Sequence, residues 1–155
     1  MQVKIAAVGR LRGGPEAALV SDYLTRIDKI GRPVGIGPAA IHEVEAKKGG
    51  MAAEAVLLEK AVEGARPLIT LDERGKVLSS PEFAEKLAYW RDDGAQVATF
   101  IIGGADGIDP ALRAKADFSL SFGRMVWPHM LVRVMLAEQL YRATSILTGS
   151  PYHRV

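Results

Sequence analysis

The stretch that decides the fold is QVATFIIGGADG, residues 96–107. Its first seven residues form a nearly continuous apolar run, which is typical of a buried strand. Gly103 and Gly104 end the run and begin a loop, and a short helical pattern follows near residues 110–116. We therefore expect a strand, a glycine-rich loop and a helix in succession, which is a unit of the α/β class.

The rest of the chain repeats this alternation. Strands are predicted at 2–8, within 33–46, at 66–72 and, more weakly, at 117–121. Helices are predicted from Pro15 to Gly31, over 51–65, from an N-cap at Ser80 to Gly94, and from Pro128 onward. The alternation predicts a single α/β domain over residues 1–155 with one mostly parallel sheet.

Composition excludes several classes of site. The 155 residues include no cysteine, so disulfides, thiolate metal sites and a cysteine nucleophile are excluded. The three histidines form no H-E-x-x-H pattern, and we expect no metal cofactor. The first apolar run, residues 5–9, is too short for a signal peptide core or a membrane span, so we expect a cytoplasmic protein with no membrane partner.

Charge is unevenly distributed along the chain. The formal net charge is +2, yet residues 111–155 alone carry +4. A basic C-terminal third suits a polyanionic partner such as RNA, although an ordinary solvated surface has a similar balance.

Three segments follow predicted strands and are expected to meet at one edge of the sheet. They are residues 71–75, 103–107 and 122–127. Ligands of open α/β sheets bind beyond the carboxyl ends of the strands. Glycines there allow close backbone approach, and Leu71, Met125 and Trp127 could surround an aromatic group such as a purine. The alternative is that such loops are simply short connections between strands and helices.

Phosphate-binding fingerprints are missing from these loops. GGADGI lacks the G-x-G-x-x-G spacing, and the chain has no G-x-x-x-x-G-K-[ST]. A nucleoside ligand without phosphates therefore fits better than a dinucleotide or a nucleoside triphosphate.

Two histidines and two arginines are candidates for chemistry. His129 follows Pro128 at a predicted helix start, where capping or packing is the simpler explanation. His153 lies beside Pro151 and Tyr152, a rigid and aromatic pair that a solvated tail does not need. His42 is expected at the surface.

The two arginines of the last helix lie nine positions apart, on opposite faces. Arg142 can pair with Glu138 one turn away, which is an ordinary surface arrangement. Arg133 lies inside the apolar run MLVRVML, where a guanidinium needs an anion, a carbonyl or another subunit as its partner. Arg133 is therefore the stronger candidate for a functional residue.

Five segments resemble one family, in order and spacing. They are AVGRLR (7–12), TLDERGK (70–76), FIIGGADG (100–107), LSFGRMVWPHMLVRVMLAEQLYRA (120–143) and PYHR (151–154). The chain resembles the RlmH family of SPOUT-class methyltransferases, which methylate N3 of a pseudouridine in the 23S RNA of the large ribosomal subunit. The resemblance spans nearly the whole chain and is most specific over its last 35 residues.

The resemblance implies a fold, an activity and a set of site residues. The fold would be a SPOUT-type α/β domain with a C-terminal trefoil knot, acting as a homodimer on the assembled 70S ribosome. S-adenosylmethionine would be the methyl donor, with no metal. The implied cofactor-binding residues are Leu71, Gly103, Phe122, Gly123, Arg124, Met125, Val126 and Trp127. The implied catalytic or substrate-binding residues are His153, Tyr152 and Arg154 of the tail, with Arg133 and Arg142, and no single general base is assigned.

Two other function classes stay open at this point. One is a non-catalytic ribosome-binding or nucleoside-sensing α/β domain, which would keep the fold without turnover. The other is a small-molecule α/β enzyme. The glycine-rich segment GRLRGGP, residues 9–15, departs mildly from the resemblance and leaves any RNA contact there open.

Overall fold

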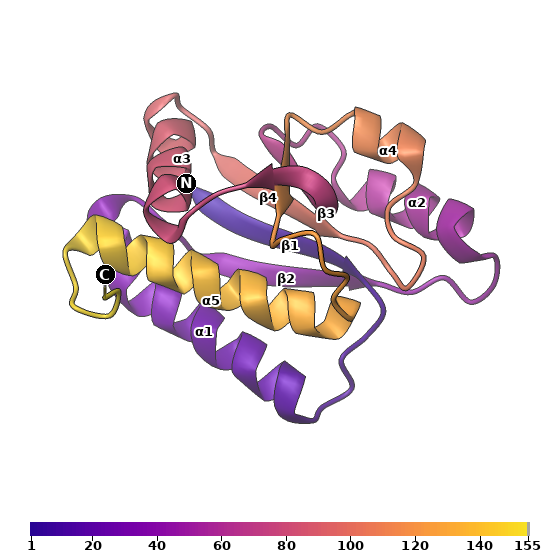
Figure 1. The fold of residues 1–155 in the computed structure, drawn as a ribbon, viewed down its shortest axis with the longest axis horizontal. Coiled ribbons are helices and arrows are strands. Elements are labelled where there is room, and N and C mark those ends of the chain that lie inside the picture. The colour runs from indigo at the N-terminus through magenta and orange to yellow at the C-terminus, as the bar shows by residue number, and fades with distance from the viewer. Residues whose placement is uncertain (155) are drawn as a thin grey trace.

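A five-stranded, all-parallel sheet forms the centre of the protein, in a computed structural model that describes residues 1–154 (Figure 1). The strand order is β2-β1-β4-β3-β5, which the sequence pattern does not define. The strands are β1 (Gln2–Val8), β2 (Ala39–Val44), β3 (Leu68–Val77), β4 (Val97–Ile102) and β5 (Phe118–Ser121). Every neighbouring pair is parallel, so the predicted fold class is confirmed.

Helices cover both faces of this sheet. They are α1 (Pro15–Gly31), the 3₁₀ turn η1 (Arg32–Val34), α2 (Gly50–Ala61), α3 (Ser80–Asp92), α4 (Pro110–Ala114) and α5 (His129–Thr148). α1, α3 and α5 share one hydrophobic core with one face of the sheet, while α2 and α4 share the other. The protein therefore has three layers, with α5 lying alongside α1 (Figure 1).

The alternation of side chains along β1 explains the two cores. Ile5 and Ala7 face the core under α1, α3 and α5, whereas Ala6 and Val8 face the core under α2 and α4. Successive side chains of a strand point to opposite faces, so a strand buried on both sides needs an unbroken apolar run. The run predicted as the first strand has this composition because both of its faces are covered.

The strands place their carboxyl ends at one edge. Ala7 of β1 is aligned with Ile102 of β4, and Val8 is aligned with Val44 of β2. The loops that leave β1, β2 and β4 therefore start side by side, and this edge positions the candidate site.

Several predicted boundaries differ from the structure; the helix predicted over 51–65, for example, ends at Ala61. The N-cap of α3 is Ser79 rather than Ser80, because Ser79 and Glu82 form a reciprocal capping box. Ser80 Oγ instead donates a hydrogen bond to Gln139 Oε1 of α5, at 2.8 Å. The third strand continues to Val77 rather than ending at residue 72, with a break in its register against β5 between Leu71 and Lys76.

Candidate active site

The three segments predicted to meet at the carboxyl edge of the sheet do line one cavity. Its volume is about 210 Å³. Residues 71–74, 103–108 and most of 122–129 form its walls. The apolar contribution comes from Leu71, Ile102, Ile108, Leu120, Phe122, Met125, Val126, Trp127 and Val132.

Most of the predicted cofactor-binding residues lie in this cavity, and one does not. The lining residues among them are Leu71, Gly103, Phe122, Gly123, Met125, Val126 and Trp127. Arg124 is exposed and does not line the cavity. Met125 and Val126 are 73% and 79% exposed, so the loop presents apolar surface that nothing in the described chain covers.

Gly103 is required by a close approach within its own loop. A Cβ at this position would lie 2.6 Å from the backbone of Gly107, because the loop turns back on itself between Gly104 and Gly107. The loop is thereby held tightly enough to keep its backbone groups at the edge of the cavity. Glu54 of α2 lies against Gly104, and burial, followed by the charge of Asp106, raises the pKa of the Glu54 carboxyl.

Asp72 is an ionised group at the wall of the cavity. Burial opposes its charge, but hydrogen bonds from Arg74 and Arg113 outweigh burial and lower the pKa of Asp72. Arg74 Nε lies 3.0 Å from Asp72 Oδ1, and Arg113 Nη1 lies 3.3 Å from Asp72 Oδ2. The two arginines fix this carboxylate between the β3 segment and α4.

His129 connects the cavity to the core. It is the first residue of α5, lines the cavity and is half-buried. Its Nδ1 lies 3.5 Å from Arg133 Nη2. Burial, followed by the charge of Arg133, lowers the pKa of His129 below its ordinary value of 6.5. The ring is therefore neutral at pH 7.

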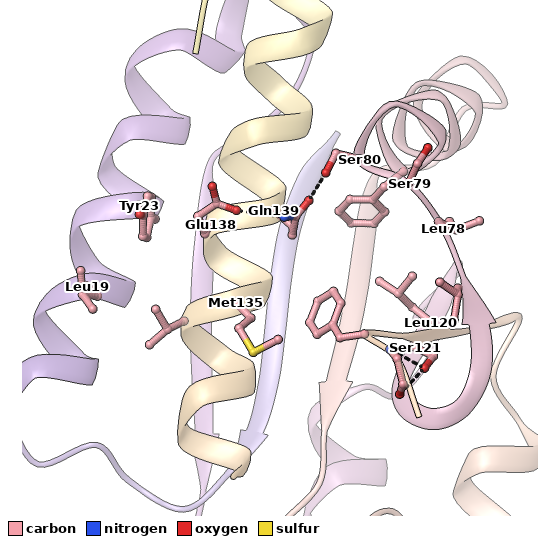
Figure 2. Close-up of a pocket in the computed structure, with 15 residues that line it drawn as sticks. Leu19, Tyr23, Leu78, Ser79, Ser80, Leu120, Ser121, Met135, Glu138 and Gln139 are labelled. Atoms are coloured by element: carbon pink, nitrogen blue, oxygen red, sulfur yellow. Dashed lines mark hydrogen bonds between the residues drawn. The ribbon is translucent and has the colours of Figure 1, made fainter. Parts of the chain in front are cut away.

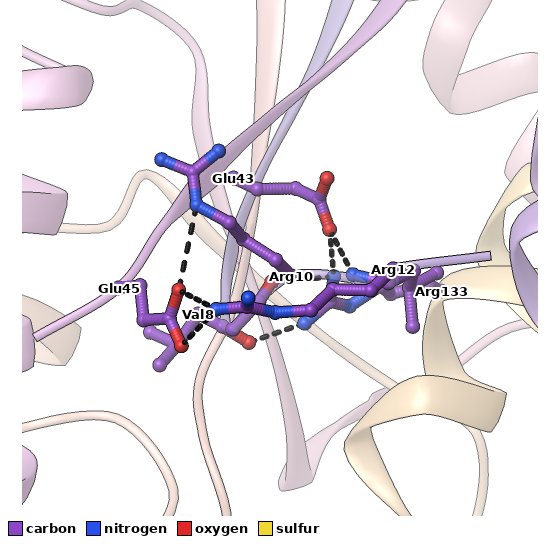
Figure 3. Close-up of polar contacts among 8 residues, drawn as sticks. Val8, Arg10, Arg12, Glu43, Glu45 and Arg133 are labelled. Carbon is purple, nitrogen blue, oxygen red and sulfur yellow. Dashed lines mark hydrogen bonds and ion pairs between the residues drawn. The ribbon is translucent and has the colours of Figure 1, made fainter.

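Arg133 is fully buried and meets its partners within the same chain (Figure 3). It donates hydrogen bonds to the carbonyl oxygens of Val8 and Gly9, at the end of β1. Its Nη1 lies 2.9 Å from Glu43 Oε2 of β2. The sequence pattern required an anion, a carbonyl or another subunit as the partner of this guanidinium. The structure shows two carbonyls and one carboxylate. Glu43 was missed by the sequence analysis, since one acidic residue in an alternating strand carries no distinctive signal.

The tail folds back onto α5 and is ordered. Tyr152 packs edge-on against Tyr141, with ring centroids 4.6 Å apart, and its hydroxyl donates to Glu138 Oε1 at 3.0 Å. Arg142 Nε donates to the same oxygen at 3.0 Å, so the predicted Glu138–Arg142 pair is confirmed. Burial, followed by the hydrogen bond to Glu138, raises the pKa of Tyr152 well above its ordinary value of 10.

His153 joins the same cluster through Arg142. Arg142 Nη1 lies 3.3 Å from His153 Nδ1. An arginine can only donate, so Nδ1 accepts and the neutral ring carries its proton on Nε2. Arg154 is exposed at the end of this turn, and Val155 lies outside the described residues. The predicted tail residues are thus gathered around Glu138 and Arg142.

The cavity and the tail cluster lie at opposite ends of α5. His129 and Arg142 are thirteen positions apart, which is about 20 Å along a helix. The tail residues and the cofactor-binding residues predicted for one site therefore do not meet within one chain.

A larger groove of about 510 Å³ lies along α5 between these two ends (Figure 2). Leu19 and Tyr23 of α1 line one side, and the turn from β3 to α3 lines the other. The groove shares Leu120, Phe122 and Gly123 with the smaller cavity and ends at Glu138. It is mainly apolar and lies beside the strand ends, not across them, so the smaller cavity is the candidate cofactor site.

Comparison with known proteins identifies the family. The family described as "Predicted SPOUT methyltransferase" matches residues 1–153. The chain belongs to the SPOUT methyltransferase family. Relatives named "Ribosomal RNA large subunit methyltransferase H" are 68% identical in Ruegeria pomeroyi and 64% identical in Paracoccus denitrificans, over 100% and 99% of both chains respectively.

Solved structures share the fold of this chain at much lower identity. A "Probable Methyltransferase" from Bordetella pertussis Tohama I has a TM-score of 0.55 at 17% identity, covering 92% of this chain and 96% of that one. A Legionella pneumophila protein solved "in complex with the bound cofactor SAM" has a TM-score of 0.51 at 15% identity, covering 90% of this chain and 65% of that one. These similarities establish the fold of this SPOUT protein independently of close relatives.

Residues 1–154 contain neither a candidate metal cluster nor a helix that could span a membrane. Within that range, no group of three or more histidine, aspartate or glutamate side chains is placed to hold a metal ion. No helix in the same range is both long and apolar enough to cross a membrane.

Proposed function

We propose that this protein transfers a methyl group from S-adenosylmethionine to N3 of a pseudouridine in 23S ribosomal RNA, as a homodimer acting on the assembled ribosome in the cytoplasm. The observation that carries the proposal is the cavity at the carboxyl edge of the sheet, formed by three separate strand-end segments in a SPOUT methyltransferase. Relatives that match over the full length are named as methyltransferases of large-subunit ribosomal RNA.

The residues of the cavity fit S-adenosylmethionine. Leu71, Met125 and Trp127 supply apolar and aromatic surface for the adenine, and the loop at Gly103 supplies backbone donors and acceptors close to the ligand. The exposed apolar side chains of residues 125–127 gain cover when such a ligand binds. Asp106 at the wall favours a ligand with positive charge, such as a sulfonium or an ammonium group, whereas the charge of Asp72 is already compensated by Arg74 and Arg113.

When bound, the cofactor supplies an already activated methyl group. The task of the protein is therefore to hold the target base with N3 in line, to exclude water and to accept the imino proton. His129 is neutral and lines the cavity, which places a proton acceptor at its wall. We assign no single general base.

The tail residues are proposed to contact the target nucleoside. Tyr152 keeps its proton because its pKa is raised, so it acts through its ring and its hydrogen bond, without ionising. His153 carries its proton on Nε2, so in this arrangement it donates a hydrogen bond to the base or to a phosphate. The exposed cation of Arg154 favours RNA phosphate.

A homodimer is supported by the outer surface of the helical layer. Leu19 of α1 and Leu131 of α5 are 44% and 42% exposed. Met135 of α5 and Leu19 both line the groove (Figure 2). α5 is apolar on its outer side as well as on its buried side, which is typical of a helix covered on both sides. A two-fold related copy would cover this face.

A dimer also resolves the separation of the two half-sites. If two α5 helices pack antiparallel, the tail end of one helix lies near the cavity end of the other. Tyr152 and His153 of one protomer then complete the cavity of its partner. The groove, which joins the cavity to Glu138, is the path along which these parts meet.

The trefoil knot is part of the same proposal. Its support is the tight packing of the segment after Leu71 on β5, where Ser121 Oγ donates to Glu73 O at 3.2 Å. A Cβ at Gly75 would lie 2.7 Å from the backbone of Ser119. Such a close fit is what a segment threaded beside another requires.

The test is methyl transfer from tritiated S-adenosylmethionine to ribosomes from a strain that lacks the protein. We expect label in 23S RNA of 70S ribosomes, and nucleoside mapping should find N3-methylpseudouridine. Separated 50S subunits and free 23S RNA serve as comparison substrates and should accept less label. Binding of ribosomes without transfer to any substrate would contradict the proposal and favour a non-catalytic ribosome-binding domain.

A further inference from the structure

The loop between β1 and α1, residues 9–14, carries two exposed arginines on an unusually well-anchored base. Arg133 holds the carbonyls of Val8 and Gly9, and Glu43 Oε2 accepts a hydrogen bond from Leu11 N at 2.6 Å (Figure 3). The Gly9 amide donates to Val44 O at 2.7 Å. A surface loop fixed by a fully buried guanidinium is preorganised, which lowers the entropy cost of binding a partner.

The two arginine side chains of this loop pair with the same carboxylate. Arg10 Nε and Arg12 Nη2 lie 3.4 Å and 3.0 Å from the same Glu45 carboxylate (Figure 3). All three side chains are largely exposed, and exposed ion pairs of this kind contribute only about 0–1 kcal/mol. A phosphate can therefore replace the carboxylate at little cost.

The neighbouring loop adds to the positive charge. Lys47 and Lys48 are exposed and follow Glu45 beyond the end of β2, which is paired with β1. Across both loops, residues 9–14 and 45–49 carry four exposed cations and a single acid, Glu45. The two loops form a basic rim at the carboxyl edge of β1 and β2.

This rim is connected directly to the cofactor cavity. Gly9 has a φ of +89°, and a Cβ there would lie 3.6 Å from the ring of His129, which lines the cavity. β1 also lies beside β4, whose end carries the loop at Gly103. A polyanion held by Arg10 and Arg12 would consequently run past the mouth of the cavity.

From this geometry we infer that Arg10 and Arg12 form a phosphate-contact surface for ribosomal RNA, with Glu45 as the carboxylate that the RNA backbone displaces. The inference rests on the proposed function and assigns a substrate contact separate from the tail. Arg133 acts here as a positioning residue, because it touches the loop backbone from inside the core and not the RNA.

The test compares R10Q/R12Q with the control K29Q/R32Q. Lys29 and Arg32 are exposed at the other end of α1, and the Met1 amino group bonds Gly35 O nearby, which places the control charges at the opposite edge of the sheet. Ribosome binding is measured by sedimentation over a range of salt concentrations, alongside kcat, KM for ribosomes and the Kd for S-adenosylmethionine.

We expect R10Q/R12Q to raise the Kd and KM for ribosomes by about five-fold or more, since two phosphate contacts are lost. The plot of log Kobs against log salt concentration has a negative slope, and the magnitude of this slope should decrease by about 1 to 2. The values of kcat and of the cofactor Kd should stay within two-fold, and K29Q/R32Q should match the wild type. E45Q should bind ribosomes more tightly, because the competing carboxylate is gone.

The inference would be overturned if R10Q/R12Q bound ribosomes like the control, or if E45Q bound them no more tightly than the wild type. A cofactor Kd that changes along with ribosome binding would also overturn it, because the loop would then act on the cavity. Failure of the proposed function gives a different result. In that case the wild type transfers no methyl group, while the binding measurements still decide whether the rim contacts ribosomes.

Discussion

Arg133 Nη1 lies 2.9 Å from Glu43 Oε2, joining the start of α5 to β2 across the end of β1. Arg133 is 0% exposed and Glu43 is 23% exposed in their side chains, so water screens the pair poorly. Burial lowers the pKa of Arg133, and the charge of Glu43 opposes that change. The pair therefore holds a charge in the core at the point where the cavity, the basic rim and α5 converge.

Arg133→Ala should destabilise the protein by about 3–5 kcal/mol, because removing one partner of a buried pair leaves the other uncompensated. The two carbonyls at the end of β1 would also lose their donor. Arg133→Lys should recover part of this loss. Arg91→Ala is the control, since Arg91 lies near the surface and donates to Val34 O. Urea denaturation and methyl transfer measure both effects, and equal stability and turnover of the two alanine variants would contradict the prediction.

Deleting residues 151–155 should abolish methyl transfer while leaving the fold and most cofactor binding intact. The tail packs on the outside of α5 through Tyr152 and His153, and it contributes nothing to the lining of the cavity. Circular dichroism, calorimetry with S-adenosylmethionine and the ribosome assay measure these three properties. Transfer at the wild-type rate would show that the tail takes no part in the reaction.

Local sequence patterns predicted the fold well where one physical cause dominates. Gln2–Val8 and Pro15–Gly31 have the predicted bounds, because an apolar run, a first-turn proline and a terminal glycine each act locally. The N-cap of α3 was misplaced by one residue because Ser79 and Ser80 are both capable caps, and Glu82 decides between them. Strand order depends on contacts between distant segments, which no local pattern contains.

The sequence predicted many residues of the candidate site but not how they are arranged in space. The glycine loops and Trp127 were found because parallel strands must end at the same edge. The buried partner of Arg133 was not found, since Glu43 is ninety positions away in the chain. The tail lies away from the cavity because of the length and direction of α5. This separation can be recognised only once the position of the helix on the sheet is known.

Gly103→Ala should weaken S-adenosylmethionine binding by about ten-fold or more. The added methyl group would lie 2.6 Å from the backbone of Gly107, so the loop must shift away from its present course. Gly64→Ala is a control for backbone strain alone, since Gly64 has a φ of +73° and open space around it and does not line the cavity. Calorimetric titration measures the Kd, and an unchanged value would show that the loop does not contact the cofactor.

Stability should fall as the pH is lowered from 7.5 to 5.5, in part because of His129. Its folded pKa is below 6.5, so the unfolded chain binds the proton more strongly. The contribution is fully present above pH 6.5 and is lost as the pH falls through the folded pKa. His129→Gln should flatten this part of the profile. Urea unfolding at each pH checks this, and identical profiles for the His129 variant and the wild type would contradict it.

At an S-adenosylmethionine concentration near the wild-type Kd, mixing two variants of low activity should raise activity if the tail of one protomer completes the cavity of the other. One variant lacks residues 151–155, and the second carries Gly103→Ala. In a mixed dimer of the proposed kind, the tail of the Gly103→Ala chain meets the intact cavity of the truncated chain. Random exchange makes half of the dimers mixed, with one complete site in each, so about a quarter of all sites should be active.

If the tail instead serves the cavity of its own chain, every site in the mixture lacks one part and the activity does not rise. Measuring methyl transfer after unfolding and refolding the two variants together, with each refolded alone as the control, distinguishes the two arrangements.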